Sequence, residues 1–508
     1  MHHRSWLSLT LLTFAALPPG LASAQIGADQ ALGAASDLRA KLKPPSIGGE
    51  VMFGKIGEDV FARTLLRFNY DAENWGIGLG IPLSIRLVDN DPKNGKLLRI
   101  EDWDEPSDFF RLVRYVYVGD PSKTGPFYIR LGELAGLSMG HGTVIHRYYN
   151  GFDLNRYRLG TNVALNVGAF GVDAVIGDLV RPTDPTVVGF RFQVKPLMLV
   201  DLGESAPAST GAASPDAPPG EGAPTPAPAP SETQEGDGLY GAIADRLHVG
   251  FTLLVDPTAP LELRTSGAQV LLDDQENPQI ARERALVVTG VDVGYDLLRG
   301  LIRVTPYIDL NKITYVDSGW GFHAGVLWGL RIPAVIDTFT VDLRTEYRRV
   351  SGDYVSPYFN STYEVERFEA PPGSRTPKLG SLVAQAGQPG KNGAVFDLVL
   401  GFPSFAYIGG EYINYDSAIP DGSIRLSLEV PALEVVELSA FYYRINIDGF
   451  SDMFALDDRS AIVAEARIPL YTFFSLNLRW WRVWRPEQTG SYEAVDDWSV
   501  GFGFSFPL

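Results

Sequence analysis

Apolar and polar residues alternate with a period of two along most of this chain. Between positions 498 and 508 the even positions are apolar, and the odd positions from 499 to 505 carry only Ser and Gly. The same alternation runs through residues 75–87, 320–332 and 339–347. Because successive side chains of a strand point to opposite faces, each segment has one apolar face and one small or polar face. The pattern predicts an all-β protein.

Two features favour a transmembrane antiparallel β-barrel over a soluble sandwich, which alternates in the same way. The segments often run 10 to 14 residues, whereas soluble strands run about 5 or 6 and tilted membrane strands roughly 9 to 11. Their polar faces mix Gly and Ser with charges of both signs, as a water-filled lumen allows, while the apolar faces would meet lipid. The charged residues predicted to face the lumen are Arg303, Asp309, Arg331, Asp342, Arg344, Glu346, Glu411, Arg425 and Arg467.

Divided into consecutive hairpins, the alternating segments give about 22 strands, within a range of 16 to 22. The predicted strands are 60–70, 74–82, 83–88, 109–119, 126–138, 157–167, 170–178, 186–195, 197–202, 245–255, 260–272, 284–297, 300–311, 319–332, 337–350, 393–402, 404–416, 422–430, 433–447, 459–468, 470–484 and 496–508. The weakest are 83–88, 197–202 and 260–272. An even count follows if both termini lie on one side of the membrane.

Proline marks one end of many predicted strands, where its missing N–H costs no ladder hydrogen bond. The marked ends are Ile81-Pro82, Lys195-Pro196, Ile332-Pro333, Phe402-Pro403, Val430-Pro431, Ile468-Pro469 and Phe506-Pro507. From Pro333 onward the next strand begins within a few residues, and the opposite ends carry longer connections. Outer-membrane barrels have short periplasmic turns and long external loops, so we expect the proline-marked end to face the periplasm.

Two long connections are predicted as external loops, at 203–244 and 351–392. The first contains Ser205 to Gly238, which is rich in Pro, Ala, Gly, Glu and Ser and lacks the apolar content to fold alone. The second begins with aromatic and charged residues, so it is expected to be ordered and is a candidate for an inward-folded constriction.

The N-terminus has the layout of a secretory signal peptide, residues 1–24. His2, His3 and Arg4 precede an apolar run, and small residues end at Ala24. The run is shorter than the roughly 20 residues that span a membrane. Residues 25–58 then form a predicted periplasmic segment with a short helix at 28–43, and 59–508 the barrel.

Composition excludes several classes of function. The chain has no Cys, so it has neither disulfides nor thiolate metal sites. Its net charge of −18 argues against nucleic-acid binding. No segment after the signal peptide has 18 uninterrupted apolar residues, so no membrane-spanning helix is predicted.

Few residues suggest catalysis, and we predict no enzyme, cofactor or metal. His141 and His146 lie in one predicted loop near Ser138, which allows a Ser-His hydrolase or an Asp-His protease on the barrel rim, but an ordinary polar loop explains them better. No two histidines have a metal-ligand spacing such as H-E-x-x-H. His323 is predicted to be a polar lumen residue.

The segment Arg479 to Arg485 has the most distinctive composition. Trp480, Trp484 and Trp498 are expected at the membrane interface, where Trp is enriched. Arg482 shares their face and is a candidate for bidentate contact with lipid phosphates. We therefore expect a lipopolysaccharide-contact band here, with an ordinary aromatic girdle as the alternative.

Taken together, the signal peptide, the alternating strands and the aromatic last strand resemble Gram-negative, porin-like outer-membrane β-barrels over nearly all of residues 60–508. The resemblance is to the class and not to an individual family. It implies an outer-membrane location, contact with outer-membrane lipids and the barrel-assembly machinery, and a possible periplasmic partner for the N-terminal segment. Such barrels often end in Phe or Trp, whereas this chain ends in Phe506-Pro507-Leu508.

The sequence leaves four functions open. The first is a channel for solutes or an exported polymer, because a barrel of this size has room for an aqueous lumen. The second is a surface scaffold or adhesion barrel that displays its long loops. The third is a transporter of hydrophobic compounds with the N-terminal helix as plug, and the fourth is the rim enzyme.

Overall fold

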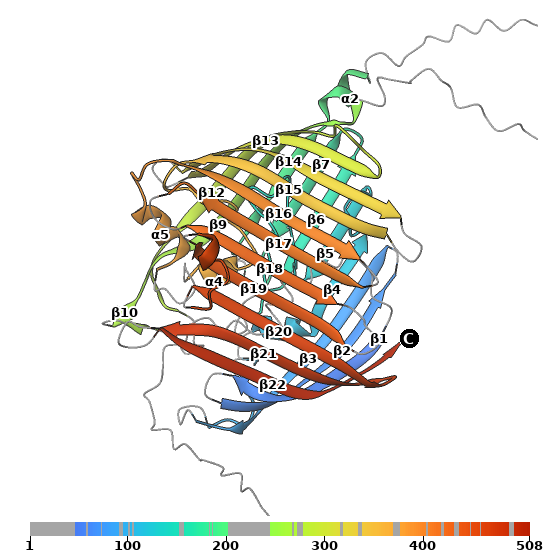
Figure 1. Ribbon diagram of the computed structural model, residues 1–508, viewed down its shortest axis with the longest axis vertical. Helices are drawn as coiled ribbons and strands as arrows, with labels where there is room; N and C mark the ends of the chain where they lie inside the picture. Colours follow the sequence, from blue (N-terminus) through green and yellow to red (C-terminus); the bar gives the residue numbers. More distant parts are fainter. Residues whose placement is uncertain are drawn as a thin grey trace, which may run out of the picture.

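The computed structural model contains a closed antiparallel barrel of 20 strands (Figure 1). Strands that follow each other in the chain pair with each other around the ring. The first strand, β1 (Ser46–Ile56), also pairs with the last, β22 (Tyr492–Pro507), over nine residue pairs from Ser46 to Gly54. This pairing closes the barrel and leaves the sheet without an open edge. The predicted fold class is confirmed, and the count of 20 lies within the predicted range.

The structure describes residues 46–201 and 244–507 with short gaps. The gaps are 57–58, 73, 91–94, 100–101, 104–105, 152–156, 182, 185, 267–268, 272–277, 315–318, 334–337, 369–375, 403–404, 418–420, 431–435, 448, 458 and 487–491. The predicted signal peptide, the predicted helix at 28–43 and the Pro/Ala-rich segment 205–238 lie outside the described residues.

Eighteen more strands complete the ring between β1 and β22. The first half contains β2 (Asp59–Asp71), β3 (Trp75–Val88), β4 (Val113–Gly119), β5 (Phe127–Gly132), β6 (Gly160–Val167), β7 (Phe170–Ile176), β8 (Val188–Val194), β9 (Leu247–Leu263) and β12 (Ile280–Tyr295). The second half contains β13 (Ile302–Thr314), β14 (Trp320–Pro333), β15 (Thr338–Val350), β16 (Lys391–Phe402), β17 (Ala406–Tyr415), β18 (Gly422–Val430), β19 (Glu437–Ile447), β20 (Ser460–Tyr471) and β21 (Phe474–Pro486).

The two ends of the barrel differ. One end carries the connections 89–112, 133–159 and 351–390, and we call it the loop end. The opposite turn end carries the start of β1, the end of β22 and short turns such as 168–169. Figure 1 shows α4, α5 and β10 on the loop side and the C-terminus on the other.

Within the described residues the helices are few and short. They are η3 (Pro106–Leu112), α2 (Pro196–Asp201), α4 (Tyr363–Glu366), α5 (Lys378–Ala384) and η4 (Phe450–Asp452). A small hairpin of β10 (Thr265–Ser266) and β11 (Gln269–Val270) lies in the connection from β9 to β12. Within the described part of the chain, none of the helices combines the length and hydropathy needed to cross a membrane.

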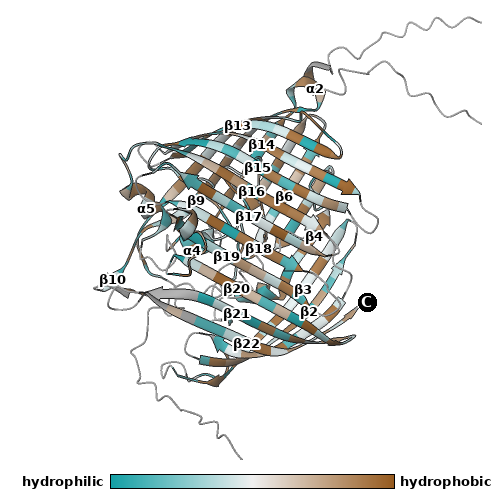
Figure 2. Ribbon diagram, in the orientation of Figure 1, coloured by the Kyte–Doolittle hydropathy of each residue, from teal (hydrophilic) through white to brown (hydrophobic). Residues whose placement is uncertain are grey.

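The outer surface is apolar and much of the inner surface is small or polar, and Figure 2 shows the resulting alternation along the strands. In β22 the outward side chains of Trp498, Val500 and Phe502 are 54%, 40% and 57% exposed, whereas inward Ser499 is 3% exposed. Soluble proteins rarely leave such a continuous apolar surface open to water. A closed barrel with this surface is the form in which strands cross a membrane.

Four predicted strands are joined into two in the structure. Segments 74–82 and 83–88 form the single strand β3, and segments 245–255 and 260–272 are replaced by β9. Pro82 does not end β3 because the pairing with β4 stops at Leu79, so the missing N–H leaves no β4 partner unpaired.

The predicted strand 197–202 is wrong, because these residues form the helix α2. Pro196 is the first residue of this helix, a position where the fixed φ of proline is favourable. Because the predicted strand 197–202 does not exist, the connection that follows lies at the opposite end of the barrel from the predicted one. The chain leaves β8 at Val194 and enters β9 at Leu247 at the turn end, so segment 203–244, which we expected as an external loop, connects two strands on the side of the termini.

Sequence reasoning missed the strand β1. We placed the start of the barrel at residue 59 and assigned 25–58 to a periplasmic segment, but the first strand begins at Ser46. Its outward residues Ile47, Val51 and Phe53 alternate with small or polar inward residues, except that the inward Met52 is large, apolar and buried. The adjacent pair Gly48-Gly49 weakens this signal, because glycine lowers strand propensity.

An outward charge should destabilise this barrel more than an inward one. We expect Val500→Arg, at the middle of β22, to cost about 2–4 kcal/mol because the guanidinium would lie in hydrocarbon. Urea unfolding in lipid vesicles measures the change. The control Ser505→Arg places the same side chain on the inner face of the same strand and should cost under about 1 kcal/mol. Equal losses would contradict the assignment of the two faces.

Candidate functional site

The connection between β5 and β6 folds inward as a hairpin, which we call the lumen hairpin and define as residues 137–148. Leu137 and Tyr148 exchange two backbone hydrogen bonds of 3.0 and 2.9 Å. At the tip, the backbone N–H of Gly142 donates to the carbonyl of Met139 at 3.1 Å. Gly142 has a φ of 79°, in the left-handed region that favours glycine. The predicted strand 126–138 therefore ends at Gly132, and the chain beyond it is free to enter the lumen.

The lumen hairpin reaches the opposite wall. Counting around the ring of 20 strands, β5 and β15 are eight strands apart, close to a diameter. At the tip, His141 Nδ1 lies 2.7 Å from Asp309 Oδ1 of β13, and the Thr143 hydroxyl donates to Asp309 Oδ2 at 2.6 Å. Arg344 of β15 donates to the backbone carbonyls of His141 and Gly142 at 3.0 and 3.2 Å. Asp309 and Arg344 lie near the middle of their strands, so the tip lies at mid-height in the barrel.

A second contact joins the hairpin to β16. His146 Nε2 lies 2.9 Å from Asp397 Oδ2, and Nδ1 lies 3.1 Å from Ser138 Oγ. Because a carboxylate only accepts, we place the imidazole proton on Nε2 and let the Ser138 hydroxyl donate to Nδ1. Burial, reinforced by the Arg344 charge, lowers the pKa of His146 from 6.5 to about 4. This imidazole is therefore neutral at ordinary pH.

The residues Ser138, His146 and Asp397 have the composition of a hydrolase triad, but their contacts hold the hairpin in place. Ser138 Oγ already accepts a hydrogen bond of 2.8 Å from the Arg147 backbone N–H. Ser138 faces Nδ1 and Asp397 faces Nε2, the reverse of the arrangement in serine proteases. The arrangement ties both strands of the hairpin to each other and to the wall.

The structure also brings together two groups of metal-ligand type. They are His141 with Asp292 and Asp309, and His146 with Asp397 and Glu411, with donor atoms within 4.8 Å in each group. Arginines already face these carboxylates: Arg191 bonds both oxygens of Asp292, and Arg344 and Arg425 lie 3.2 and 3.1 Å from Glu411. Their positive charge opposes a bound cation, so the groups fit ion-pair networks better than metal sites. Sequence spacing gave no sign of them, because their members are far apart in the chain.

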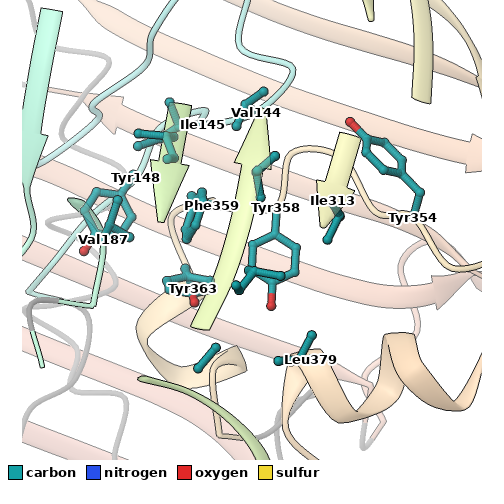
Figure 3. Packing of buried hydrophobic residues seen from close by; sticks show 14 of the residues in the cluster. Val144, Ile145, Tyr148, Val187, Ile313, Tyr354, Tyr358, Phe359, Tyr363 and Leu379 are labelled. Atoms are coloured by element: carbon teal, nitrogen blue, oxygen red, sulfur yellow. The ribbon is translucent and has the colours of Figure 1, made fainter. Parts of the chain in front are cut away.

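A second connection enters the lumen from the opposite side. We call residues 351–368, between β15 and β16, the inner loop. Its Phe359 exchanges backbone hydrogen bonds with the lumen hairpin, to the Val144 carbonyl at 3.2 Å and from the His146 N–H at 3.0 Å. The Ser356 hydroxyl donates to the Thr143 carbonyl at 2.6 Å. The two connections thus form one structure inside the barrel, as Figure 3 shows for Val144, Ile145 and Phe359.

Charged groups fix the inner loop to the wall. Arg367 Nε donates to Asp256 of β9 at 2.8 Å, and Glu366 accepts from the Tyr443 hydroxyl of β19 at 2.9 Å. Glu364 lies fully buried, 3.1 Å from the Arg158 guanidinium. Burial raises the pKa of Glu364 against the opposing effect of Arg158. The loop is therefore held on both sides of the lumen.

Apolar side chains fill the space around these two connections. Tyr148, Phe359 and Tyr363 pack together, and Figure 3 shows Val187 at Tyr148 and Ile313 near Tyr358 in the same cluster. Inward wall residues of the same cluster are Leu254, Leu286, Val288, Ile313, Val350, Val395 and Ile413. This part of the inner face is apolar, which differs from the uniformly polar lumen that the alternation predicted.

Glycines in the wall leave space for the packed interior. A Cβ at Gly294 of β12 would lie 2.7 Å from His141 Nε2. A Cβ at Gly321 of β14 would lie 2.5 Å from the Tyr354 ring. Both distances are shorter than real Cβ contacts, so a side chain at either position would displace His141 or Tyr354.

All nine charged residues predicted for the lumen lie on the inner face. Five surround the hairpin at mid-height, namely Asp309, Arg344, Glu346, Glu411 and Arg425. Nearer the turn end, Arg303 and Arg331 both bond Asp342, at 3.1 and 2.8 Å. Arg467 pairs with Glu437 at 3.4 Å. His323, also predicted inside, lies between Glu346 at 3.0 Å and the Tyr354 hydroxyl at 3.2 Å.

The expected girdle residues Trp480, Arg482 and Trp498 lie on the outer face. Arg482 bonds both oxygens of Asp496, with Nε at 2.7 Å from Oδ1, and its guanidinium lies 5.8 Å from the Trp480 ring centre. The Asp496 carboxylate thus occupies the two donors of the Arg482 guanidinium that we expected to bind lipid phosphate. The side chain of Trp484, the remaining residue of the expected girdle, lies outside the described residues.

Comparison with known proteins found no matching family model and no matching curated protein. Solved outer-membrane barrels are similar at low identity. OccK11 of Pseudomonas aeruginosa is 11% identical with a TM-score of 0.30, over 92% of this chain and 95% of that one. Wzi, a carbohydrate-binding barrel involved in capsule assembly in Escherichia coli, is 9% identical with a TM-score of 0.31, over 96% and 100%. The Escherichia coli import receptor Fiu is 10% identical with a TM-score of 0.36, over 92% and 82%.

The class of the protein follows from its own structure. An even number of antiparallel strands closes into a barrel with an apolar exterior, and the first and last strands share the turn end. This is the architecture of bacterial outer-membrane proteins. The protein is an outer-membrane β-barrel whose lumen is crossed by two inward-folded connections.

Removing Asp309 should release the hairpin tip without opening the barrel. We expect Asp309→Ala to speed hydrogen exchange in residues 137–148 by about tenfold or more, because two hydrogen bonds to a charged group are lost. Mass spectrometry of exchanged peptides measures this. Asp342→Ala is the control, because Asp342 lies on the inner wall and bonds Arg303 and Arg331 instead. Equal exchange in the two variants would show that Asp309 does not hold the tip.

Docking of the hairpin should weaken with acid. The pKa of His146 is about 4 when docked and 6.5 when free. The released state therefore binds a proton that the docked state excludes, so docking is strongest above about pH 6.5 and weakens as the pH falls toward 4. Hydrogen exchange of residues 137–148 between pH 7 and 4, corrected for intrinsic rates, measures the effect. His146→Gln should lose most of this pH dependence, and an unchanged profile would assign it to another group.

Proposed function

We propose that this protein is an outer-membrane channel whose lumen is regulated by the lumen hairpin. The observation that carries the proposal is the hairpin itself, which crosses the barrel at mid-height and is held there by side-chain contacts with Asp309, Arg344 and Asp397. Barrels of 16 to 18 strands already leave an aqueous channel, so a ring of 20 strands has room for one beside an inward-folded loop. Freeing the tip breaks these polar contacts and exposes the buried Val144 and Ile145, but it leaves the barrel ladder intact.

Small polar solutes fit this lumen better than a thick polymer. The hairpin and the inner loop occupy the middle of the barrel together, which reduces the cross-section available for transport. The inner face near the turn end carries charges of both signs, such as Arg303 and Asp342. Rings of mixed charge give little preference for cations or anions.

A surface scaffold is the second candidate function. The apolar cluster that includes Tyr148, Tyr358 and Tyr363 supports it, because a well-packed interior resembles a permanent core. On this view the barrel would display its loop-end connections to a partner and conduct nothing.

Conductance distinguishes the two functions. We expect the wild-type protein in planar bilayers to show small or infrequent conductance steps. Replacing residues 139–145 with Gly-Ser-Gly should enlarge the steps severalfold and make the open state persistent, because the tip no longer crosses the lumen. Heat-modifiable migration in gels checks that the barrel is folded, and Asp342→Ala is the control. A folded deletion variant without conductance would reject the channel and favour the scaffold.

A further inference from the structure

The outer face of the barrel contains a groove over β14, β15, β16 and β17. Its volume is about 560 Å³. The small outward residues Ala324 and Ala394 lie in it, and the larger Tyr347, Phe396 and Tyr412 lie along its sides. Ala324 and Ala394 are the cross-strand partners of Tyr347 on either side. Two alanines beside one large ring thus create a hollow where neighbouring parts of the surface carry large apolar residues.

The groove is suited to hydrocarbon. Its outward residue Thr345 accepts a hydrogen bond of 3.1 Å from the indole N–H of Trp328, so both polar groups are satisfied within the protein. The Tyr347 hydroxyl donates to Asn392 Oδ1 at 2.7 Å, toward the loop end. A groove on the outer face of a membrane barrel meets lipid, and the exposed surface within this one is largely apolar.

A basic side chain lies directly above the groove. Arg349 is outward and exposed, two residues beyond Tyr347 toward the loop end of β15. Its guanidinium donates to the Gly390 carbonyl at 3.3 Å and to Asn392 Oδ1 at 3.2 Å, which are both neutral acceptors. The Asp416 carboxylate is hydrogen-bonded by Asn392 and is attracted by the Arg349 charge, but no ion pair is formed between the two among the described residues.

Lys312 lies nearby but already has an interaction within the protein. It is outward and exposed near the loop end of β13, two strands from Arg349. Arg482, on the distant outer face of β21, differs from Arg349 in one respect. Its fork already bonds both oxygens of Asp496, whereas Arg349 bonds neutral oxygens. Arg349 therefore keeps a charge that a phosphate can approach.

We propose that the groove binds a phosphorylated lipid, with an acyl chain in the groove against Tyr347 and Phe396 and a phosphate at Arg349. The arrangement matches such a lipid in both chemistry and orientation. Its apolar part lies toward the middle of the membrane, and its cationic part lies at the loop end, where the headgroups are. The proposal depends only on the barrel being in a membrane, so it holds whether or not the lumen conducts.

Native mass spectrometry of the full-length protein in a non-ionic detergent, titrated with diphosphoryl hexa-acyl lipid A, tests the site. We expect saturable binding that Arg349→Ala weakens about tenfold, through loss of the charge-assisted contact. Ala394→Phe should weaken binding to a similar degree, because the ring fills the groove. The matched controls Arg482→Ala and Ala464→Phe make the same changes on the outer face of β21 and β20, and both should stay within about twofold of wild type.

Other outcomes would overturn the proposal. Equal binding of a lipid A without phosphates would remove the headgroup contact. Full competition by millimolar inorganic phosphate would assign the site to free phosphate. A change of oligomeric mass in Ala394→Phe without loss of lipid would make the groove an interface between copies of this chain. If Ala394→Phe fails to migrate as a folded barrel, Ala394→Leu replaces it, and unchanged binding in that variant together with Arg349→Ala would reject the site.

Discussion

A strand that crosses a membrane cannot leave its backbone N–H and C=O groups facing hydrocarbon, and this constraint determines the rest of the structure. The pairing of β1 with β22 completes the ring, so even Gly48 and Gly54, which contribute no side chain, are held by neighbours on both sides. Within the described strands, proline lies where the pairing with one of the two neighbouring strands has already ended. Pro306 of β13 lies just beyond the pairing with β12, which ends at Tyr307.

Closure of 20 strands creates a second requirement, because the space inside must be filled by water or by protein. The wall alone cannot fill it, so two connections enter from nearly opposite sides. Charges that are removed from water in this way need partners, since an unpaired buried charge is strongly destabilising. Arg344 illustrates the result. It bonds two backbone carbonyls of the lumen hairpin and also lies 3.2 Å from Glu411. The Arg344 side chain therefore bonds both the wall of the barrel and the lumen hairpin.

The period-two pattern was sufficient to predict the barrel and the side on which each charged residue lies, because both follow from alternation within one strand. Strand ends depend on the neighbouring strands, and here local signals misled. Pro82 looked like a strand end although β3 continues through it, and the apolar residues after Pro196 looked like a strand although they form α2. That single error placed the connection 203–244 on the wrong side. The contact of His141 with Asp309 joins residues 168 positions apart, and no local pattern encodes it.

The hairpin and the ladder are stabilised by different interactions, and this separation makes a regulated lumen physically reasonable. The barrel depends on backbone bonds between neighbouring strands, none of which involves residues 139–146. The hairpin tip depends on side chains such as His141, Thr143 and His146 and on two backbone bonds with Phe359. Breaking these contacts costs far less than opening the ring. Release of the tip also exposes the buried side chains of Val144 and Ile145, but it is a local opening that leaves the ladder of the wall intact. A lumen hairpin that shared the backbone ladder of the wall could not move without breaking the barrel.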